Sequence, residues 1–367
     1  MSNLLDYLDW RGDLSFENAP VNEVDALVFA WIAYYEFEKL ETEIAGRTLR
    51  EIAALHEARF GAFEKPRLRD APGTPIPSAI WMVHCASQTR RFGSLKALDF
   101  HAVNEAGTQF GAITFEIPDR RMVAFRGTDN SLNGWREDFE LSFSQEVPSQ
   151  RLAQDYLNRT AGAEPLLLCG HSKGGNIAVY AAVNAAPKQR ARIEHIWNFD
   201  GPGFCYPIKE RESYRELRGR MEKIVPEASI IGMLMTDRDE TFRIIDSKMR
   251  GVFQHNGMFW QVLGTCFVEV DRRTASSLLI DDTLSRWISD MPLEDRKKFT
   301  EVIFTVIEST GVRDFSDMNE HALTAGRRML ASIRTLTREQ KRMALELFLR
   351  LIRACREVIV GEEATDE

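Results

Sequence analysis

The sequence predicts an α/β fold with a mostly parallel central sheet flanked by helices. Strand-like runs alternate with helix-like spacing in the middle of the chain, which is typical of parallel strands joined by crossover helices. An apolar run, LLLC at 166–169, stops abruptly at a glycine cluster and is followed at once by helical spacing. The 367 residues are 44% hydrophobic and 28% charged, an ordinary composition for a globular protein with a large core.

The first helical segment is expected at 23–41, where apolar residues recur at three and four positions after Asn22, a suitable N-cap. Residues 64–79 contain four prolines and are expected to form an exposed connection. We therefore expect three regions: an N-terminal helical extension packed on the core (1–79), the α/β core (80–265) and a C-terminal helical region (266–367).

The core is expected to begin with three strands joined by hairpins and to continue with parallel strands. The hairpin connections are NEAGTQ and PD. A helix at 176–184 separates the last two strands. The expected strands are Leu98–Val103, Phe110–Ile117, Arg121–Phe125, Pro165–Cys169 and Ile193–Phe199.

The region after about Cys266 is expected to be mainly helical. Thr337 and Gln340 form a predicted capping box before an apolar face that includes Met343, Leu347, Leu351 and Cys355. Between Arg327 and Arg356, nine Arg and Lys residues accompany only two Glu. A solvated helix face is the favoured interpretation, and a docking patch for an anionic membrane or a partner is the alternative.

The amino-acid composition disfavours several classes of function. A formal net charge of −8 disfavours nucleic-acid binding, which needs a basic face. The five cysteines are widely spaced, without a CxxC pair for zinc, so they are expected to be buried thiols in a reducing compartment. The N-terminus resembles no signal peptide and no segment is long enough to span a bilayer, so a cytoplasmic location is expected.

The glycine cluster contains the candidate nucleophile, Ser172, in GHSKGG at 170–175. A nucleophile elbow needs a strand that ends at the serine, small flanking residues and a helix that starts at once. All three are present here, with Gly170, Gly174 and Gly175 giving the steric room. At the start of a helix, free N–H groups stabilise developing negative charge.

The serine needs a base, and the chain order of this arrangement puts the histidine after Ser172. His195 precedes a predicted strand and is therefore at the wrong end of the sheet, and His321 lies in the helical region. His255, in a glycine-flanked loop beside aromatic residues, is the candidate base. His171 adjoins the serine, but adjacent side chains diverge, so a structural role is expected for it.

The acid that orients the histidine is predicted to be Asp200, directly after a parallel strand. An Asx turn before glycine is an equally good explanation of this aspartate. The alternatives for the acid are Asp246, Glu227 and Asp237.

The oxyanion hole is expected from the backbone N–H of Lys173 and from the loop that contains Gly127 and Thr128. Arg126, Trp135 and Asp138 are expected to brace that loop.

These motifs resemble a known group. VAFRGT at 123–128 and GHSKGG are similar to the class 3 lipases of the α/β-hydrolase superfamily. Together with YLDWRGDLSFENAPVNEVDALV, VPEASIIGMLM and GVFQHNGMFWQV, they resemble more closely the bacterial Mbeg1-like family of uncharacterised predicted hydrolases, over about residues 1–265. The resemblance implies Ser172 as nucleophile, Thr128 beside the oxyanion hole and His255 as base.

Two departures from the lipase pattern matter. Lys173 replaces an apolar residue and is expected to favour an anionic substrate, and the segment that often carries the lipase acid is only IVPE at 224–227.

The leading hypothesis is a serine hydrolase that cleaves small carboxylic esters with no metal or cofactor. The alternatives are a non-catalytic scaffold on a hydrolase fold and a thioesterase or peptidase with the same triad. Peripheral contact with a membrane is compatible with the sequence, and the oligomeric state does not follow from it.

Overall fold

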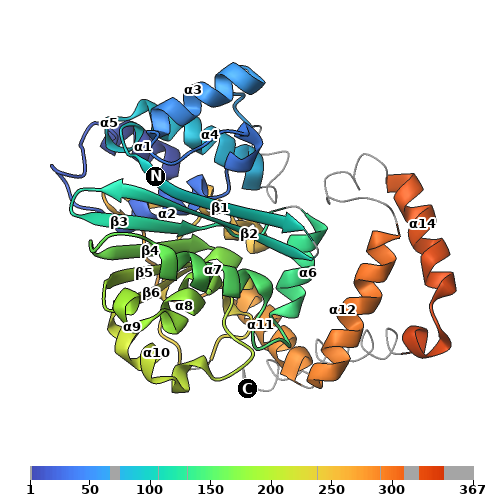
Figure 1. The fold of residues 1–367 in the computed structure, drawn as a ribbon. Helices are drawn as coiled ribbons and strands as arrows, with labels where there is room; N and C mark the ends of the chain where they lie inside the picture. Colours follow the sequence, from blue (N-terminus) through green and yellow to red (C-terminus); the bar gives the residue numbers. More distant parts are fainter. Residues whose placement is uncertain are drawn as a thin grey trace.

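A computed structural model describes residues 2–66, 75–105, 107–129, 131–237, 239–289, 291–309 and 322–342. A seven-stranded sheet lies between two layers of helices (Figure 1). The strands follow one another in chain order across the sheet; β1 to β3 are antiparallel, and β3 to β7 are parallel. The strands are β1 (Ala97–Glu105), β2 (Thr108–Ile117), β3 (Arg120–Phe125), β4 (Leu166–His171), β5 (Ile193–Phe199), β6 (Met221–Pro226) and β7 (Arg243–Ile245).

One face of the sheet is covered by helices that precede it, and the other by helices that alternate with its strands. The first group is α1 (Leu4–Arg11), α2 (Glu23–Ile32), α3 (Leu49–Phe60), α4 (Pro75–Gln88) and α5 (Arg90–Gly93). The second is α7 (Pro148–Arg159), α8 (Lys173–Asn184), α9 (Pro187–Arg190) and α10 (Glu212–Leu217). A small hairpin, β8 (Val262–Leu263) and β9 (Cys266–Phe267), follows the main sheet.

Strand β4 shows why this part of the sequence is continuously apolar. Leu166 and Leu168 join the hydrophobic cluster on the α8 side, whereas Leu167 and Cys169 join the cluster on the α2 side. Every residue of β4 is therefore buried, as expected for a strand with helices on both faces. The predicted parallel sheet and both hairpins are confirmed, but β6 and β7 were not predicted.

Helix α2 is shorter than the 23–41 predicted. The Arg126 guanidinium donates to the carbonyl oxygens of Ala33 and Tyr35, at 2.9 and 2.8 Å. In a continuing helix these carbonyls would accept bonds from amides four residues later. The long-range contact ends the helix at Ile32, and a separate 3₁₀ turn follows at Phe37–Leu40.

The proline-rich segment is only partly a connection. Helix α4 starts at Pro75, where a missing N–H costs a helix nothing, and Ala79 is completely buried. The expected limit at residue 79 thus falls inside a helix. Residues 67–74 lie outside the described part of the chain.

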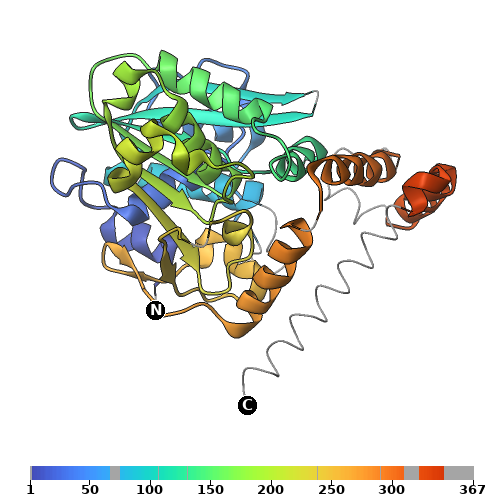
Figure 2. The ribbon, with the colours of Figure 1, turned by 90° about the horizontal axis from the view of Figure 1, so that it is seen from below.

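Three helices represent the C-terminal region in the described residues: α11 (Ala275–Ser289), α12 (Leu293–Glu308) and α14 (Ala322–Thr335). Figure 2 shows α11 along the core and α12 and α14 beyond it. The predicted capping box is confirmed, because Gln340 Oε1 accepts from the Thr337 amide and Thr337 Oγ1 accepts from the Gln340 amide. The apolar face predicted at 343–355, with Cys355, lies outside the described residues, and so do three residues of the basic stretch, Arg350, Arg353 and Arg356.

Candidate active site

The site lies where three parallel strands end together. Phe125 of β3 pairs with Gly170 of β4, and His171 of β4 pairs with Phe199 of β5. The residues that follow each strand therefore emerge at one edge of the sheet, where open α/β sheets bind their ligands. These residues include Thr128, Ser172 and Asp200.

Ser172 occupies a strained turn between β4 and α8. Its φ is 59° and its ψ is −130°, a conformation that few residues other than glycine adopt. A Cβ atom at Gly170 would lie 2.2 Å from the Gly174 backbone, and one at Gly174 would lie 2.4 Å from the Phe125 carbonyl oxygen. The glycines are needed for this turn, as the sequence predicted.

His255 and Asp200 form a close pair. His255 lies at the end of a 3₁₀ turn, Gly251–His255, and its Nδ1 is 2.6 Å from an Asp200 carboxylate oxygen. Asp200 is fully buried, and the Ser229 hydroxyl donates to its other oxygen at 2.5 Å. The carboxylate thus orients the imidazole with Nδ1 toward Asp200, which leaves Nε2 on the opposite side of the ring.

The other carboxylates considered as the acid have different partners. Asp237 pairs with Lys209, and Glu227 accepts from the Gln254 side chain. Asp246 forms backbone hydrogen bonds beside the small hairpin. Among the rejected histidines, His195 lies in β5 next to Glu222, and His321 is outside the described residues.

His171 connects the serine turn to the His255 segment. Its Nε2 is 2.7 Å from the His255 carbonyl oxygen, and the two rings lie 4.6 Å apart. The Tyr34 hydroxyl lies 2.9 Å from Nδ1. Burial, followed by the charge of His255, lowers the pKa of His171 to about 3, so this ring is neutral. Since a carbonyl only accepts, Nε2 carries the hydrogen and Nδ1 accepts from Tyr34.

The loop after β3 packs directly on the start of α8. A Cβ atom at Gly174 would lie 3.0 Å from the Gly127 amide nitrogen, so Thr128 is close to the first turn of the helix. The Lys173 amide is the first of α8 and has no intrahelical acceptor. The amides of Thr128 and Lys173 are the candidate oxyanion donors.

The Thr128 hydroxyl donates to the Asp138 carboxylate, with distances of 2.8 and 2.7 Å to its two oxygens. Burial raises the pKa of Asp138 from 3.8 to about 6. This hydroxyl is therefore already engaged, and the Thr128 backbone amide is the group left for a substrate. Arg126 braces the loop as expected, through its ion pair with Glu38.

The Lys173 side chain does not act as the sequence led us to expect. Its ammonium group is 2.8 Å from the Glu137 carboxylate and also donates to the side chain and the carbonyl of Gln109. Both charged side chains are almost completely buried. The expectation that this cation favours an anionic substrate is wrong, because Glu137 already neutralises it.

Comparison with known proteins identifies the family to which this chain belongs. The Mbeg1-like family model matches residues 86–305, more than half of the chain. The chain belongs to the Mbeg1-like family. Its fold is that of the α/β-hydrolases, with a mostly parallel sheet and helices on both faces. No curated protein matches the sequence.

Several solved lipase structures have a similar fold at low identity. M37 lipase is 15% identical, with a TM-score of 0.37, over 58% of this chain and 70% of its own. A mutant form of MDLA from Penicillium cyclopium is 13% identical, with a TM-score of 0.39, over 67% and 83%. The Rhizomucor miehei lipase propeptide complex is 12% identical, with a TM-score of 0.37, over 61% and 68%.

In this Mbeg1-like protein an apolar cavity of about 280 Å³ opens at Ser172. Its walls come from α6 (Leu132–Glu140), from the loops after β5 and β6, and from the C-terminal helices α11 and α12. Its lining is Trp135, Asp138, Phe139, Leu141, Ser142, Ser172, Lys173, Pro202, Ile231, Leu234, Met235, Leu284, Met291, Arg296, Phe299 and Thr300. We call it the apolar cavity. The contribution of the C-terminal helices was not predicted.

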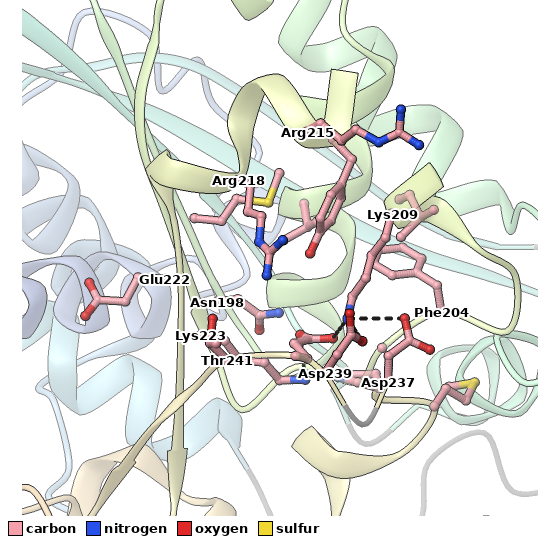
Figure 3. Close-up of a pocket in the computed structure, with 18 residues that line it drawn as sticks. Asn198, Phe204, Lys209, Arg215, Arg218, Glu222, Lys223, Asp237, Asp239 and Thr241 are labelled. Carbon is pink, nitrogen blue, oxygen red and sulfur yellow. Dashed lines mark hydrogen bonds and ion pairs between the residues drawn. The ribbon is translucent and has the colours of Figure 1, made fainter. Parts of the chain in front are cut away.

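A second cavity, also of about 280 Å³, shares Pro202 and Met235 with the first and is rich in charged groups (Figure 3). We call it the polar cavity. Lys209 forms ion pairs with Asp237 and Asp239 across it. Lys223 is buried and contacts Glu240 and the Thr236 hydroxyl. Burial lowers the pKa of Lys223.

No cluster of potential metal ligands occurs among the residues that the structure describes. Within the same residues, no helix is both long and apolar enough to cross a bilayer. The four cysteines described (Cys85, Cys169, Cys205 and Cys266) are free thiols. The expectation that they are buried is confirmed for Cys169 and is wrong for Cys266, which is exposed.

Proposed function

We propose that this protein is a serine hydrolase that cleaves carboxylic esters of small molecules through an acyl-enzyme intermediate. The observation that carries the proposal is the buried Asp200 carboxylate 2.6 Å from His255 Nδ1, beside a serine held on a strained turn. The His171 contact with the His255 carbonyl keeps the serine and histidine segments together.

In the first step, the Ser172 hydroxyl oxygen attacks the ester carbonyl carbon, and His255 Nε2 takes the hydroxyl proton. The tetrahedral oxyanion accepts hydrogen bonds from the amides of Thr128 and Lys173. Each such donor is typically worth about a hundredfold or more in rate. His255 then gives its proton to the departing alkoxide, which leaves as the alcohol.

In the second step, His255 takes a proton from water while the water oxygen attacks the acyl carbon. Collapse of this intermediate breaks the bond to Ser172 and returns the proton to its oxygen. Asp200 stays ionised throughout and stabilises the imidazolium. A thioester or an amide reacts by the same steps, so substrate panels distinguish these classes. We propose that the reaction takes place in the cytoplasm, in keeping with the free thiols.

A fluorophosphonate probe tests the proposal directly. We expect covalent labelling of the folded protein at Ser172 and no labelling of Ser172→Ala. Ser142→Ala is a matched control, since Ser142 also lines the apolar cavity but lies at no strained turn. Failure of the folded wild-type protein to label would favour a binding or scaffold protein. Turnover of p-nitrophenyl esters, acyl-CoA and peptides would then assign the substrate class.

A further inference from the structure

Arg296 introduces a positive charge into the wall of the apolar cavity. It lies in the first turn of α12, next to Phe299 and Thr300, which also line the cavity. The other groups that this C-terminal region contributes to the wall include Leu284 and Met291. The wall is mostly apolar but also includes Asp138 and Lys173, and Arg296 itself is half-buried, so its charge is partly removed from water.

The hydrogen bonds that Arg296 forms do not neutralise its positive charge. Its Nε donates to the Met291 carbonyl at 3.0 Å, and its Nη1 donates to the Ser142 carbonyl at 2.6 Å. Within the described part of the chain no carboxylate forms an ion pair with it. Burial lowers the pKa of Arg296, and the nearby Cys205 thiol partly opposes this shift.

Three more deeply buried arginines differ from the half-buried Arg296 in this respect. Arg91 is paired with Asp25, Arg126 with Glu38 and Arg273 with Asp281. Two carbonyl bonds hold the Arg296 guanidinium in place, and no counterion for its charge is found among the described residues. An arginine has five N–H donors, so donors remain for an anion.

We propose that the apolar cavity binds an acyl chain that carries an anionic group at the end remote from the ester, and that Arg296 binds this anion. The inference rests on the proposed function and specifies its substrate: a half-ester of a dicarboxylic acid, or a chain of similar length ending in phosphate. The apolar wall takes the methylene groups, and the guanidinium takes the terminal charge. Cavities for small molecules typically combine these features, an apolar lining with a few placed polar groups.

Two esters of equal chain length provide the test: p-nitrophenyl octanoate, and the mono-p-nitrophenyl ester of octanedioic acid. Because charge-assisted hydrogen bonds are strong, we expect the wild-type protein to prefer the anionic ester by about tenfold or more in kcat/KM. Arg296→Gln should abolish this preference, so that kcat/KM for the anionic ester falls relative to that for the neutral octanoate until their ratio is about one. Arg296→Lys should keep part of the preference.

The matched control is Lys297→Gln, which removes the same charge from the next residue, exposed on the same helix and outside the cavity lining. It should leave the ratio unchanged. A wild-type ratio of one or less, or a ratio that Arg296→Gln does not alter, would overturn the inference. So would an equal fall of the ratio in Lys297→Gln, because that would indicate a general surface potential. A phosphate-ended chain, tested in the same way, distinguishes the two anions.

Failure of the inference is distinguishable from failure of the proposed function. If p-nitrophenyl acetate is hydrolysed and Ser172 is labelled, but neither anionic ester is preferred, only the inference is wrong. If no ester is hydrolysed and nothing is labelled, the proposed function is wrong. Calorimetric binding of the two octanoyl-length esters to Ser172→Ala provides a readout without turnover and without altering Arg296. We expect the anionic ester to bind about tenfold more tightly, and equal affinities would contradict the proposal.

Discussion

The two cavities that share Pro202 have the same volume, about 280 Å³, but different linings, one mostly apolar and the other rich in charged groups. Both also include Met235 in their walls. In the polar cavity, Lys209 and Lys223 are already satisfied by acidic side chains. In the apolar cavity, the Ser172 hydroxyl and the Arg296 charge lack such partners among the residues described. The comparison teaches that the number of charged groups in a cavity is a poor guide to a ligand site. A better guide is whether its polar groups remain available to a ligand after the chain has folded.

The largest expected effect comes from removing the nucleophile of the apolar cavity. Ser172→Ala should lower kcat for a p-nitrophenyl ester by roughly 10⁴- to 10⁶-fold, because serine and histidine act as one unit in such triads. Steady-state kinetics measure this, with a thermal melt to verify folding. A variant that kept more than about one hundredth of the wild-type kcat would contradict the assignment.

Asp200→Asn should have the next largest effect on rate, roughly 10³- to 10⁴-fold in kcat, because the amide no longer fixes the tautomer of His255. Asp246→Asn is the matched control, since Asp246 was an alternative for the acid, and it should stay within about twofold of the wild type. If the two variants behaved in the opposite way, Asp246 would be the acid.

Lys173→Met should lower the free energy of unfolding and leave the substrate specificity unchanged. Glu137 would remain buried without its cation, and breaking a buried pair in this way typically costs about 3–5 kcal/mol in the free energy of unfolding. The double variant Lys173→Met with Glu137→Gln should recover much of the loss. Urea unfolding measures both variants. If Lys173→Met changed the preference for anionic over neutral esters, the Lys173 side chain would have a role in substrate binding after all.

Asp138→Asn should change how stability depends on pH. The pKa of Asp138 is raised to about 6, so between pH 4 and 6 the folded protein binds more protons than the unfolded chain. Wild-type stability from this group is therefore greatest at low pH and falls as pH rises to about 6. Asparagine lacks this dependence.

We expect the free energy of unfolding of Asp138→Asn, relative to that of the wild type, to be about 2.5 kcal/mol larger at pH 7 than at pH 4, because the wild type loses the stability that this group gives it at low pH. Urea unfolding at both pH values provides the measurement. Asp155→Asn, an exposed change on α7, should show no such difference. A relative stability of Asp138→Asn that did not change with pH would contradict a raised pKa.

The smallest effect is expected in the polar cavity. Lys209→Gln removes a cation that is partly exposed and paired with exposed acids, so it should cost less than about 1 kcal/mol of stability. Ester hydrolysis should stay within about twofold of the wild type. A large loss of activity would mean that the two cavities act together.

The parts of the fold and the site that were predictable have local causes. The turn at Ser172 needs glycines within four residues of it, so a short stretch is sufficient to identify it. Strand β4 is apolar throughout because both of its faces are covered. Strand β7 has three residues, and β6 contains Glu222 and Lys223, so neither has a clear strand pattern.

The parts that were missed depend on contacts between distant segments. The end of α2 depends on Arg126, more than ninety positions away in sequence. The sequence predicts that the region after Cys266 is helical, but only the folded chain brings Phe299 of this region to the cavity at Ser172. Likewise, the sequence marks Lys173 as a cation near the nucleophile, but not the burial of its ammonium group against Glu137.

Through His171, the N-terminal part of the chain contacts the candidate active site. Trp31 stacks on this ring, and Tyr34 bonds to it, while the ring itself holds the backbone of His255. A protein that began at residue 80 would keep Ser172, His255 and Asp200. It would lose the Trp31 and Tyr34 rings that pack against His171. Proteolytic removal of this first part of the chain should therefore abolish the proposed ester hydrolysis even though the three residues proposed for the chemistry remain.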